Sequence, residues 1–132
     1  MRECLEGEQA IDLARAPRDY RLGQAKMAAG HYAEADASFR QALETDPNNR
    51  MGMAGVGVVQ HAQRHWAESA ESIARSRTRD PAILLDLCDD YLRLGRKKDA
   101  ELAAELVRSF GAGDKTILSA LDKLLSNPGA VP

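Results

Sequence analysis

The chain has 132 residues, enough for one domain with a modest core but too short for a core plus a separate catalytic domain. Its composition is rich in Ala, Leu, Arg, Glu and Asp and poor in aromatic and β-branched residues, which favours an all-α fold. With a formal net charge of -2, the chain lacks the positive field that would hold a nucleic acid, so we expect no nucleic-acid partner.

The N-terminal residues are expected to form a short amphipathic helix over 3–15, with Leu5, Ile11 and Leu13 on its apolar stripe. This region is acidic and lacks the apolar stretch of a signal peptide, and no apolar run in the chain approaches the length of a membrane span. We therefore expect a cytoplasmic protein without membrane insertion. It would be periplasmic or membrane-associated if a targeting segment had been removed from a longer protein.

Similar residues recur at a spacing of 34, which is typical of a repeated helix-turn-helix unit. The pairs are Leu22 and Val56, Gly23 and Gly57, Tyr32 and Trp66, Phe39 and Ile73, and Pro47 and Pro81. A third unit follows at a spacing of 31, which pairs Val56 with Leu87 and Gly57 with Cys88. The first helix of this third unit is therefore expected to begin early or to be shortened.

The first unit resembles the tetratricopeptide repeat family, whose pattern it matches at Leu22, Gly23, Ala35, Phe39 and Pro47. Asp19 and Lys26 stand where that family has aromatic residues, and Ser69 and Ser76 replace alanines in the second unit. The resemblance implies an all-α, right-handed superhelical solenoid of about three helix-turn-helix hairpins with a flanking helix at each end.

We expect a single domain over residues 1–125. It would comprise the helix over 3–15, repeats over 16–49, 50–80 and 81–114, a capping helix over 115–125, and then a flexible tail over 126–132. The capping helix is predicted from an apolar stripe after Asp114, which consists of Ile117, Leu118, Leu121, Leu124 and Leu125.

Small residues are predicted at the points where the two helices of a hairpin approach closely, namely Gly23, Gly57 and Cys88. Leu22, Val56 and Leu87 would fill the contact beside them.

The turns follow local rules of helix capping. Gly30 and Gly95 are predicted to end helices in the left-handed conformation, and Arg64 at the corresponding position would be strained by roughly 1 kcal/mol or more. Asp46-Pro47 and Asp80-Pro81 would each supply the N-cap and first-turn proline of the next helix.

The segment 51–62 is apolar or small on every face, which a solvent-exposed helix would not be. One stripe, predicted for core packing, consists of Met53, Val56, Gly57 and Gln60, and a second consists of Ala54, Val58, His61 and Ala62. The resemblance places the second stripe on the floor of the concave groove. Three glycines in this helix cost about 1 kcal/mol each relative to alanine. Either a bound peptide or the protein's own terminal helix compensates them by close approach, or the helix is simply buried in the stack.

The predicted function is a non-enzymatic scaffold or adaptor that binds a peptide or helix of another protein in an apolar concave groove. The predicted groove residues are Tyr20, Gln24, Met27, Ala54, Val58, His61, Leu85, Asp89 and Leu92. The lysine, arginine and asparagine clamp by which some family members bind a peptide carboxylate is not recognisable here. A homodimer, formed by docking a terminal helix into the groove of a second copy, is a further hypothesis.

Two narrower functions remain open. Three repeats flanked by helices also resemble the bacterial type III secretion chaperones that shield translocator segments, and residues 50–66 are loosely similar to theirs. A scaffold subunit of a pilus or another envelope assembly is the second alternative.

Catalytic and metal-binding patterns are weak. We find no nucleophile motif, phosphate loop or paired-carboxylate signature, and we predict no enzyme activity and no cofactor. His61 and His65 have the spacing of metal ligands but lack a third ligand, so no metal is expected. Cys4 and Cys88 are too few for a disulfide framework and are expected to be reduced.

Basic residues are expected to form ordinary solvated surface. Arg75, Arg77 and Arg79 would favour the negative end of a helix dipole. A second group could steer an acidic partner, but ordinary surface charge explains it as well: Arg93, Arg96, Lys97 and Lys98.

Overall fold

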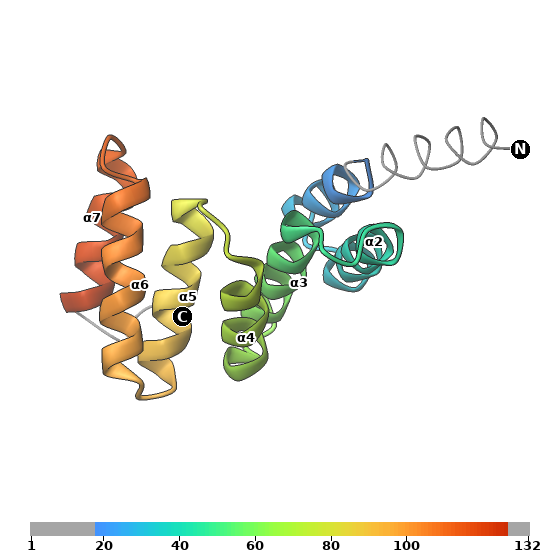
Figure 1. Cartoon of the computed structure of the whole chain (residues 1–132). Helices are drawn as coiled ribbons and strands as arrows, with labels where there is room; N and C mark the ends of the chain where they lie inside the picture. Colours follow the sequence, from blue (N-terminus) through green and yellow to red (C-terminus); the bar gives the residue numbers. More distant parts are fainter. Residues whose placement is uncertain (1–17, 127–132) are drawn as a thin grey trace, which may run out of the picture.

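The computed structural model describes residues 18–126, which are helical and contain no β-strand. In chain order, the helices are a segment over 18–28, α2 (Tyr32–Thr45), α3 (Arg50–Ala62), α4 (Trp66–Ser76), α5 (Pro81–Arg93), α6 (Lys97–Phe110) and α7 (Lys115–Ser126) (Figure 1). The prediction of an all-α helical solenoid is confirmed. The helix predicted over 3–15 and the tail after Ser126 lie outside the described residues.

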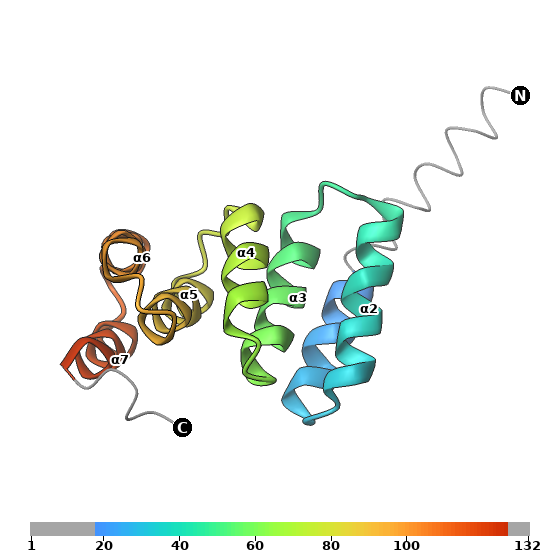
Figure 2. The ribbon, with the colours of Figure 1, turned by 90° about the horizontal axis from the view of Figure 1, so that it is seen from below.

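Consecutive helices form antiparallel hairpins, and each hairpin packs beside the next (Figure 2). The segment 18–28 pairs with α2, α3 pairs with α4, and α5 pairs with α6, while α7 packs on both α5 and α6. Helix α7 buries Leu121 and Leu124 in the C-terminal core, and Asp114 begins it by accepting a hydrogen bond from the Ile117 amide at 3.1 Å. The division into repeats at residues 49/50 and 80/81 remains a prediction of the sequence. Among the described helices, none is long and apolar enough to cross a membrane.

The prediction of small residues at close helix crossings is confirmed. A Cβ atom at Gly23 would lie 2.5 Å from Cε1 of Phe39, and one at Gly57 would lie 2.6 Å from Cγ1 of Ile73. The Cys88 thiol is buried, with its sulfur 3.4 Å from the carbonyl oxygen of Ala100. Any larger side chain at these positions would separate the two helices of its hairpin.

The prediction for the neighbouring apolar residues holds for Val56 and Leu87 but is wrong for Leu22, which is 49% exposed. Val56 shares a core cluster with Phe39 of the preceding hairpin, and Leu87 shares one with Ile73. No hairpin precedes Leu22 within residues 18–126, so this side chain has no such surface to pack on there.

The left-handed turns are confirmed. Gly30 and Gly95 have φ angles of +80° and +74°, and Arg64 has φ of +64° at the corresponding turn. Only glycine adopts this conformation without a steric penalty from Cβ, so the turn between α3 and α4 holds backbone strain.

One of the two predicted Asp-Pro helix starts is confirmed. Asp80 caps α5, its Oδ1 accepting from the Ala82 amide at 2.9 Å, and Pro81 is the first helical residue. The prediction is wrong for Asp46-Pro47, because the Asp46 carboxylate accepts from the Asn48 amide and holds a turn ahead of the helix. Asn49 caps α3 instead, accepting from the Gly52 amide at 3.1 Å.

The shorter spacing of the third unit has a different origin from the one expected. Helices α3 and α5 each have 13 residues, so the first helix of the third unit neither begins early nor is shortened. Helix α4 has 11 residues whereas α2 has 14, and this difference of three accounts for the change from 34 to 31. The missing residues therefore shorten α4 by about 4.5 Å.

Replacing Arg64 with Gly should raise the free energy of unfolding by about 0.5–1 kcal/mol, since glycine removes the left-handed strain but loses more chain entropy on folding. Urea unfolding followed by circular dichroism measures the change. Gln63→Gly is the matched control, because Gln63 has an ordinary φ of -86° and its replacement should lower stability. Equal losses in both variants would contradict the assignment of strain to Arg64.

Candidate functional site

Helix α3 is buried by its neighbours in the stack. A Cβ atom at Gly52 would lie 3.1 Å from Leu43, one at Gly55 would overlap the Phe39 ring, and one at Gly57 would overlap Ile73. The explanation by a bound peptide or a terminal helix is therefore wrong, because side chains of α2 and α4 occupy the space that these glycines leave.

The two stripes predicted for this helix do not separate into a buried one and an accessible one, because each contains both buried and half-buried residues. Ala54 is only 2% exposed, whereas Met53 and Gln60, which were predicted to lie in the core, are half-buried. Val58 and His61 are half-buried, as an accessible stripe requires. The helix is flanked by α2, α4 and α5, so more of its circumference is covered than one core stripe accounts for.

Four of the predicted groove residues come together in a hollow of about 240 Å³, which we call the inner hollow. The segment 18–28, α3 and α5 border it, and these are the first helices of the three hairpins. The lining residues are Tyr20, Gln24, Met27, Phe39, Gly55, Val58, Asp80 and Ile83.

The inner hollow combines apolar walls with a polar edge. Gln24 Nε2 donates a hydrogen bond to the Tyr20 hydroxyl at 3.2 Å, and the Tyr20 ring packs on Phe39 with centroids 5.5 Å apart. Ile83 was not predicted. Its only sequence signal is an apolar side chain in the first turn of α5, and its position depends on how the hairpins stack rather than on helical periodicity.

The other predicted residues lie elsewhere. Leu85 and Leu92 pack, half-buried, against the C-terminal core, and Ala54 lies on the floor of a second hollow of about 290 Å³ beside the first. His61 and Asp89 belong to a polar cluster between α3 and α5. The nine residues therefore do not form one groove.

The polar cluster consists of His61, Ser69, Asp86, Asp89 and Asp90. Nδ1 of His61 lies 2.7 Å from Oδ1 of Asp90, whose Oδ2 accepts a hydrogen bond from the Ser69 hydroxyl at 2.5 Å. Nε2 of His61 lies 3.5 Å from Asp86 Oδ1 and 3.7 Å from Asp89 Oδ2. One imidazole of the second hairpin thus faces three carboxylates of the third.

Arg93 and Trp66 flank this cluster. Arg93 Nε donates to Asp89 Oδ1 at 3.1 Å, and its guanidinium lies 4.4 Å from the centre of the Trp66 ring. The His61 ring meets Trp66 edge-on, with centroids 5.3 Å apart. The arginine therefore brings positive charge to the acidic side of the cluster and packs over an aromatic face.

Burial and mutual charge shift the protonation of the cluster. Burial raises the pKa of Asp86 to about 6, with Asp90 and Asp89 adding to the effect and His61 opposing it. Burial also raises the pKa of Asp90, against the hydrogen bonds from His61 and Ser69. Burial alone would lower the pKa of His61, but its hydrogen bond to Asp90 and the charges of the three carboxylates raise it.

The cluster lacks the arrangement of a metal or nucleophilic site. Within residues 18–126, no group of three or more His, Cys, Asp or Glu side chains is placed to hold a metal ion. The Ser69 hydroxyl donates to a carboxylate, not to the imidazole, so it is not activated as a nucleophile. The free thiol of Cys88 has its pKa raised by burial to about 11, which keeps it protonated and unreactive at neutral pH. Cys4 lies outside the described residues.

Comparison with known proteins gives one family match. Residues 20–49 match the family model described as tetratricopeptide repeat. This stretch contains the first hairpin from Tyr20 onward and ends at Asn49, the cap of α3. No curated protein matches the sequence of the chain.

The polar cluster should make the folded protein more stable in mild acid than at neutral pH. The pKa values of His61, Asp86 and Asp90 are raised on folding, so the folded chain binds more protons than the unfolded chain between about pH 4 and pH 7. Stability contributed in this way is present below the window and is lost as the pH rises through it. We expect a higher Tm at about pH 5.5 than at about pH 7.5, measured by differential scanning calorimetry.

Asp86→Asn isolates the effect, because it removes the charge of this half-buried side chain without changing its shape. It should raise stability at about pH 7.5, on the order of 1 kcal/mol, and this gain should shrink as the pH falls through the window toward about pH 4. Asp122→Asn on the exposed face of α7 is the control and should leave the pH profile unchanged. A profile of Asp86→Asn parallel to that of the wild type would contradict the prediction.

Proposed function

Because this chain is a tetratricopeptide repeat protein, we propose that it is a non-enzymatic interaction module whose inner hollow holds a peptide or helical segment of a partner protein. Scaffold or adaptor is the role that this implies. The resemblance places the concave surface of the family on the first helices of the hairpins, and these helices border the inner hollow.

The observation that supports the proposal is the composition of the inner hollow. Met27, Val58 and Ile83 provide half-buried apolar walls from three helices, and Tyr20 and Gln24 provide a hydroxyl and an amide at one edge. Its volume of about 240 Å³ is below the roughly 300–1,000 Å³ of small-molecule sites. It suits one or two apolar side chains of a longer segment better than an entire small ligand.

The surface continues beyond this hollow. The neighbouring hollow of about 290 Å³ shares Tyr20, Asp80 and Ile83 with it and is also lined by Arg50 and Met51. The two hollows therefore adjoin, and we call them together the furrow. A bound segment could extend along it, with an apolar anchor near Val58.

Narrower roles remain hypotheses within this function. A secretion chaperone or a subunit of an envelope assembly would use the same furrow. The likeness to a secretion chaperone rests partly on the helix predicted over 3–15, which lies outside the described residues. Self-association is a competing use of the furrow, in which a terminal helix of a second copy is the occupant. Sedimentation over a range of concentrations distinguishes self-association from binding of a different protein.

Val58→Arg should abolish binding of the partner and leave the fold intact, because Val58 is half-buried at the inner hollow. Val56→Arg is the contrasting variant, since Val56 lies in the core cluster with Phe39 and an unpaired charge there should unfold the protein. A central apolar contact at an interface contributes about 2 kcal/mol or more, so the affinity should fall at least roughly thirtyfold.

The wild-type protein serves as bait to capture the partner protein from a lysate of the native organism, and mass spectrometry identifies it. Calorimetric titration of that partner then measures the affinity of each variant, and thermal melting reports its fold. If Val58→Arg unfolds the protein as Val56→Arg does, α3 is simply core. If Val58→Arg folds and binds normally, the inner hollow is not the binding site.

A further inference from the structure

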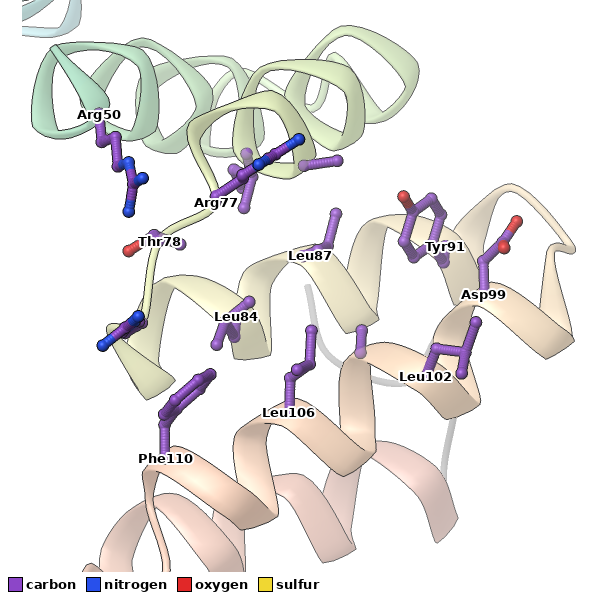
Figure 3. A pocket seen from close by; sticks show the side chains of 14 residues that line it. Arg50, Arg77, Thr78, Leu84, Leu87, Tyr91, Asp99, Leu102, Leu106 and Phe110 are labelled. Atoms are coloured by element: carbon purple, nitrogen blue, oxygen red, sulfur yellow. The ribbon is translucent and has the colours of Figure 1, made fainter. Parts of the chain in front are cut away.

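A larger hollow adjoins the second hollow of the furrow, with which it shares Arg50, Arg77, Thr78 and Arg79. It has a volume of about 480 Å³ and is bordered by the end of α4, the connection 77–79, α5 and α6 (Figure 3); we call it the outer groove. Leu84 and Leu87 of α5 form its floor, and Ile73 and Ala74 border it on α4. Like the inner hollow, it combines apolar walls with polar residues.

Helix α6 contributes an exposed apolar stripe to this groove. Leu102, Leu106 and Phe110 follow one another at intervals of four residues and are 61%, 42% and 44% exposed. Figure 3 shows Leu106 and Phe110 extending from α6 toward the side of Leu84 and Leu87. Side chains at this spacing share one face of a helix, and such a face is what a second helix packs against.

The shortened α4 accounts for the opening. Helices α4 and α6 begin at corresponding positions, 31 residues apart, but α4 ends at Ser76, which corresponds to Val107. The last turn of α6, with Phe110, therefore has no counterpart on α4. In place of a further helical turn, the chain passes along the connection 77–79.

One end of the groove is strongly basic. Arg50, Arg77 and Arg79 line it, and within residues 18–126 no carboxylate lies within ion-pair distance of any of them. Arg77 caps α4 with φ of +51°, a conformation that glycine would adopt without strain. At the other end, Asp99 accepts a hydrogen bond from Arg96 at 2.8 Å, so its charge is already compensated.

We propose that the outer groove is a second binding site, and that its occupant is an amphipathic helix of a partner protein with acidic residues at one end. The apolar face of that helix packs on Leu102, Leu106 and Phe110, and its acidic end meets Arg50, Arg77 and Arg79. Three guanidinium groups that have no carboxylate partner among residues 18–126 favour an acidic ligand over a neutral or basic one. The site goes beyond the proposed function, because its apolar part lies on α4, α5 and α6, whereas Val58 lines the inner hollow. The two surfaces adjoin at Arg50, Arg77 and Arg79.

The test uses a fluorescently labelled synthetic peptide of about four helical turns, with leucines on one face and glutamates in its first turn. A second peptide has lysines in place of the glutamates. Fluorescence anisotropy with the full chain should show binding of the acidic peptide that weakens with added salt, and at least about tenfold weaker binding of the basic one. Equal affinity for the two peptides, or no binding of the acidic peptide, would overturn the proposal.

The variants assign the binding to the groove. Leu106→Glu should lower the affinity for the acidic peptide at least about tenfold, and so should the double variant Arg77→Gly with Arg79→Gln. Arg77→Gly relieves the left-handed strain, so the double variant should remain folded, as thermal melting would confirm. Arg75→Gln is the matched control, because Arg75 lies outside the groove and its loss should leave the affinity unchanged.

Other occupants give different results. A dimer of the wild-type chain that Leu106→Glu abolishes would assign the groove to a second copy and contradict the proposal. Sedimentation with vesicles of anionic phospholipid that depends on Leu106 and the three arginines, without binding of the acidic peptide, would assign it to a membrane surface. Loss of peptide binding in Val58→Arg with retention in Leu106→Glu would place the peptide in the inner hollow and overturn the assignment.

Discussion

The contact between Phe39 and two glycines fixes how the first two hairpins meet. A Cβ atom at Gly23 would lie 2.5 Å from Cε1 of the Phe39 ring, and one at Gly55 would also overlap the ring. Because neither helix can tolerate a side chain there, one aromatic ring sets the approach of α2 to the segment 18–28 and to α3. Tyr20, packed on the same ring, is thereby held at the edge of the inner hollow, with Val58 across from it.

The same kind of contact continues along the stack. Ile73 of α4 fills the space left by Gly57, and Leu43 of α2 fills the space left by Gly52. Three glycines in one helix would be destabilising by about 1 kcal/mol each without such packing. The apolar character of α3 thus follows from its central position in the stack. From its predicted groove stripe, Val58 lines the inner hollow and His61 belongs to the polar cluster.

Features that depend on local rules could be predicted from the sequence. The left-handed glycines and the Asp80-Pro81 start depend on residues within a few positions of one another, and the period of 34 can be read directly from the recurrence of similar residues. The exposure of Leu22 and the meeting of His61 with three carboxylates of α5 depend instead on how hairpins stack, which helical periodicity does not determine. The shortening of α4 was visible only as a change in spacing, and the sequence could not show which helix had lost the residues.

The inner hollow, the outer groove and the polar cluster all lie at the junction of the second and third hairpins. The outer groove has walls on both hairpins, and the polar cluster joins the same two hairpins through His61 and the carboxylates of α5. The inner hollow is also bordered by α5, at Ile83. Protonation within the cluster therefore affects a junction on which both proposed binding surfaces depend.

The central claim is that this solenoid presents two protein-binding surfaces, one at Val58 and one at Leu106, which adjoin at the connection 77–79. Methyl NMR of isotopically labelled protein, titrated with the segment of the partner identified by capture and separately with the acidic helical peptide, tests it most directly. We expect the partner segment to shift the methyl signals of Met27, Val58 and Ile83, and the acidic peptide to shift those of Leu102 and Leu106. If both ligands shift the same set of methyl groups, or if neither shifts any of these five, the account of two surfaces is contradicted.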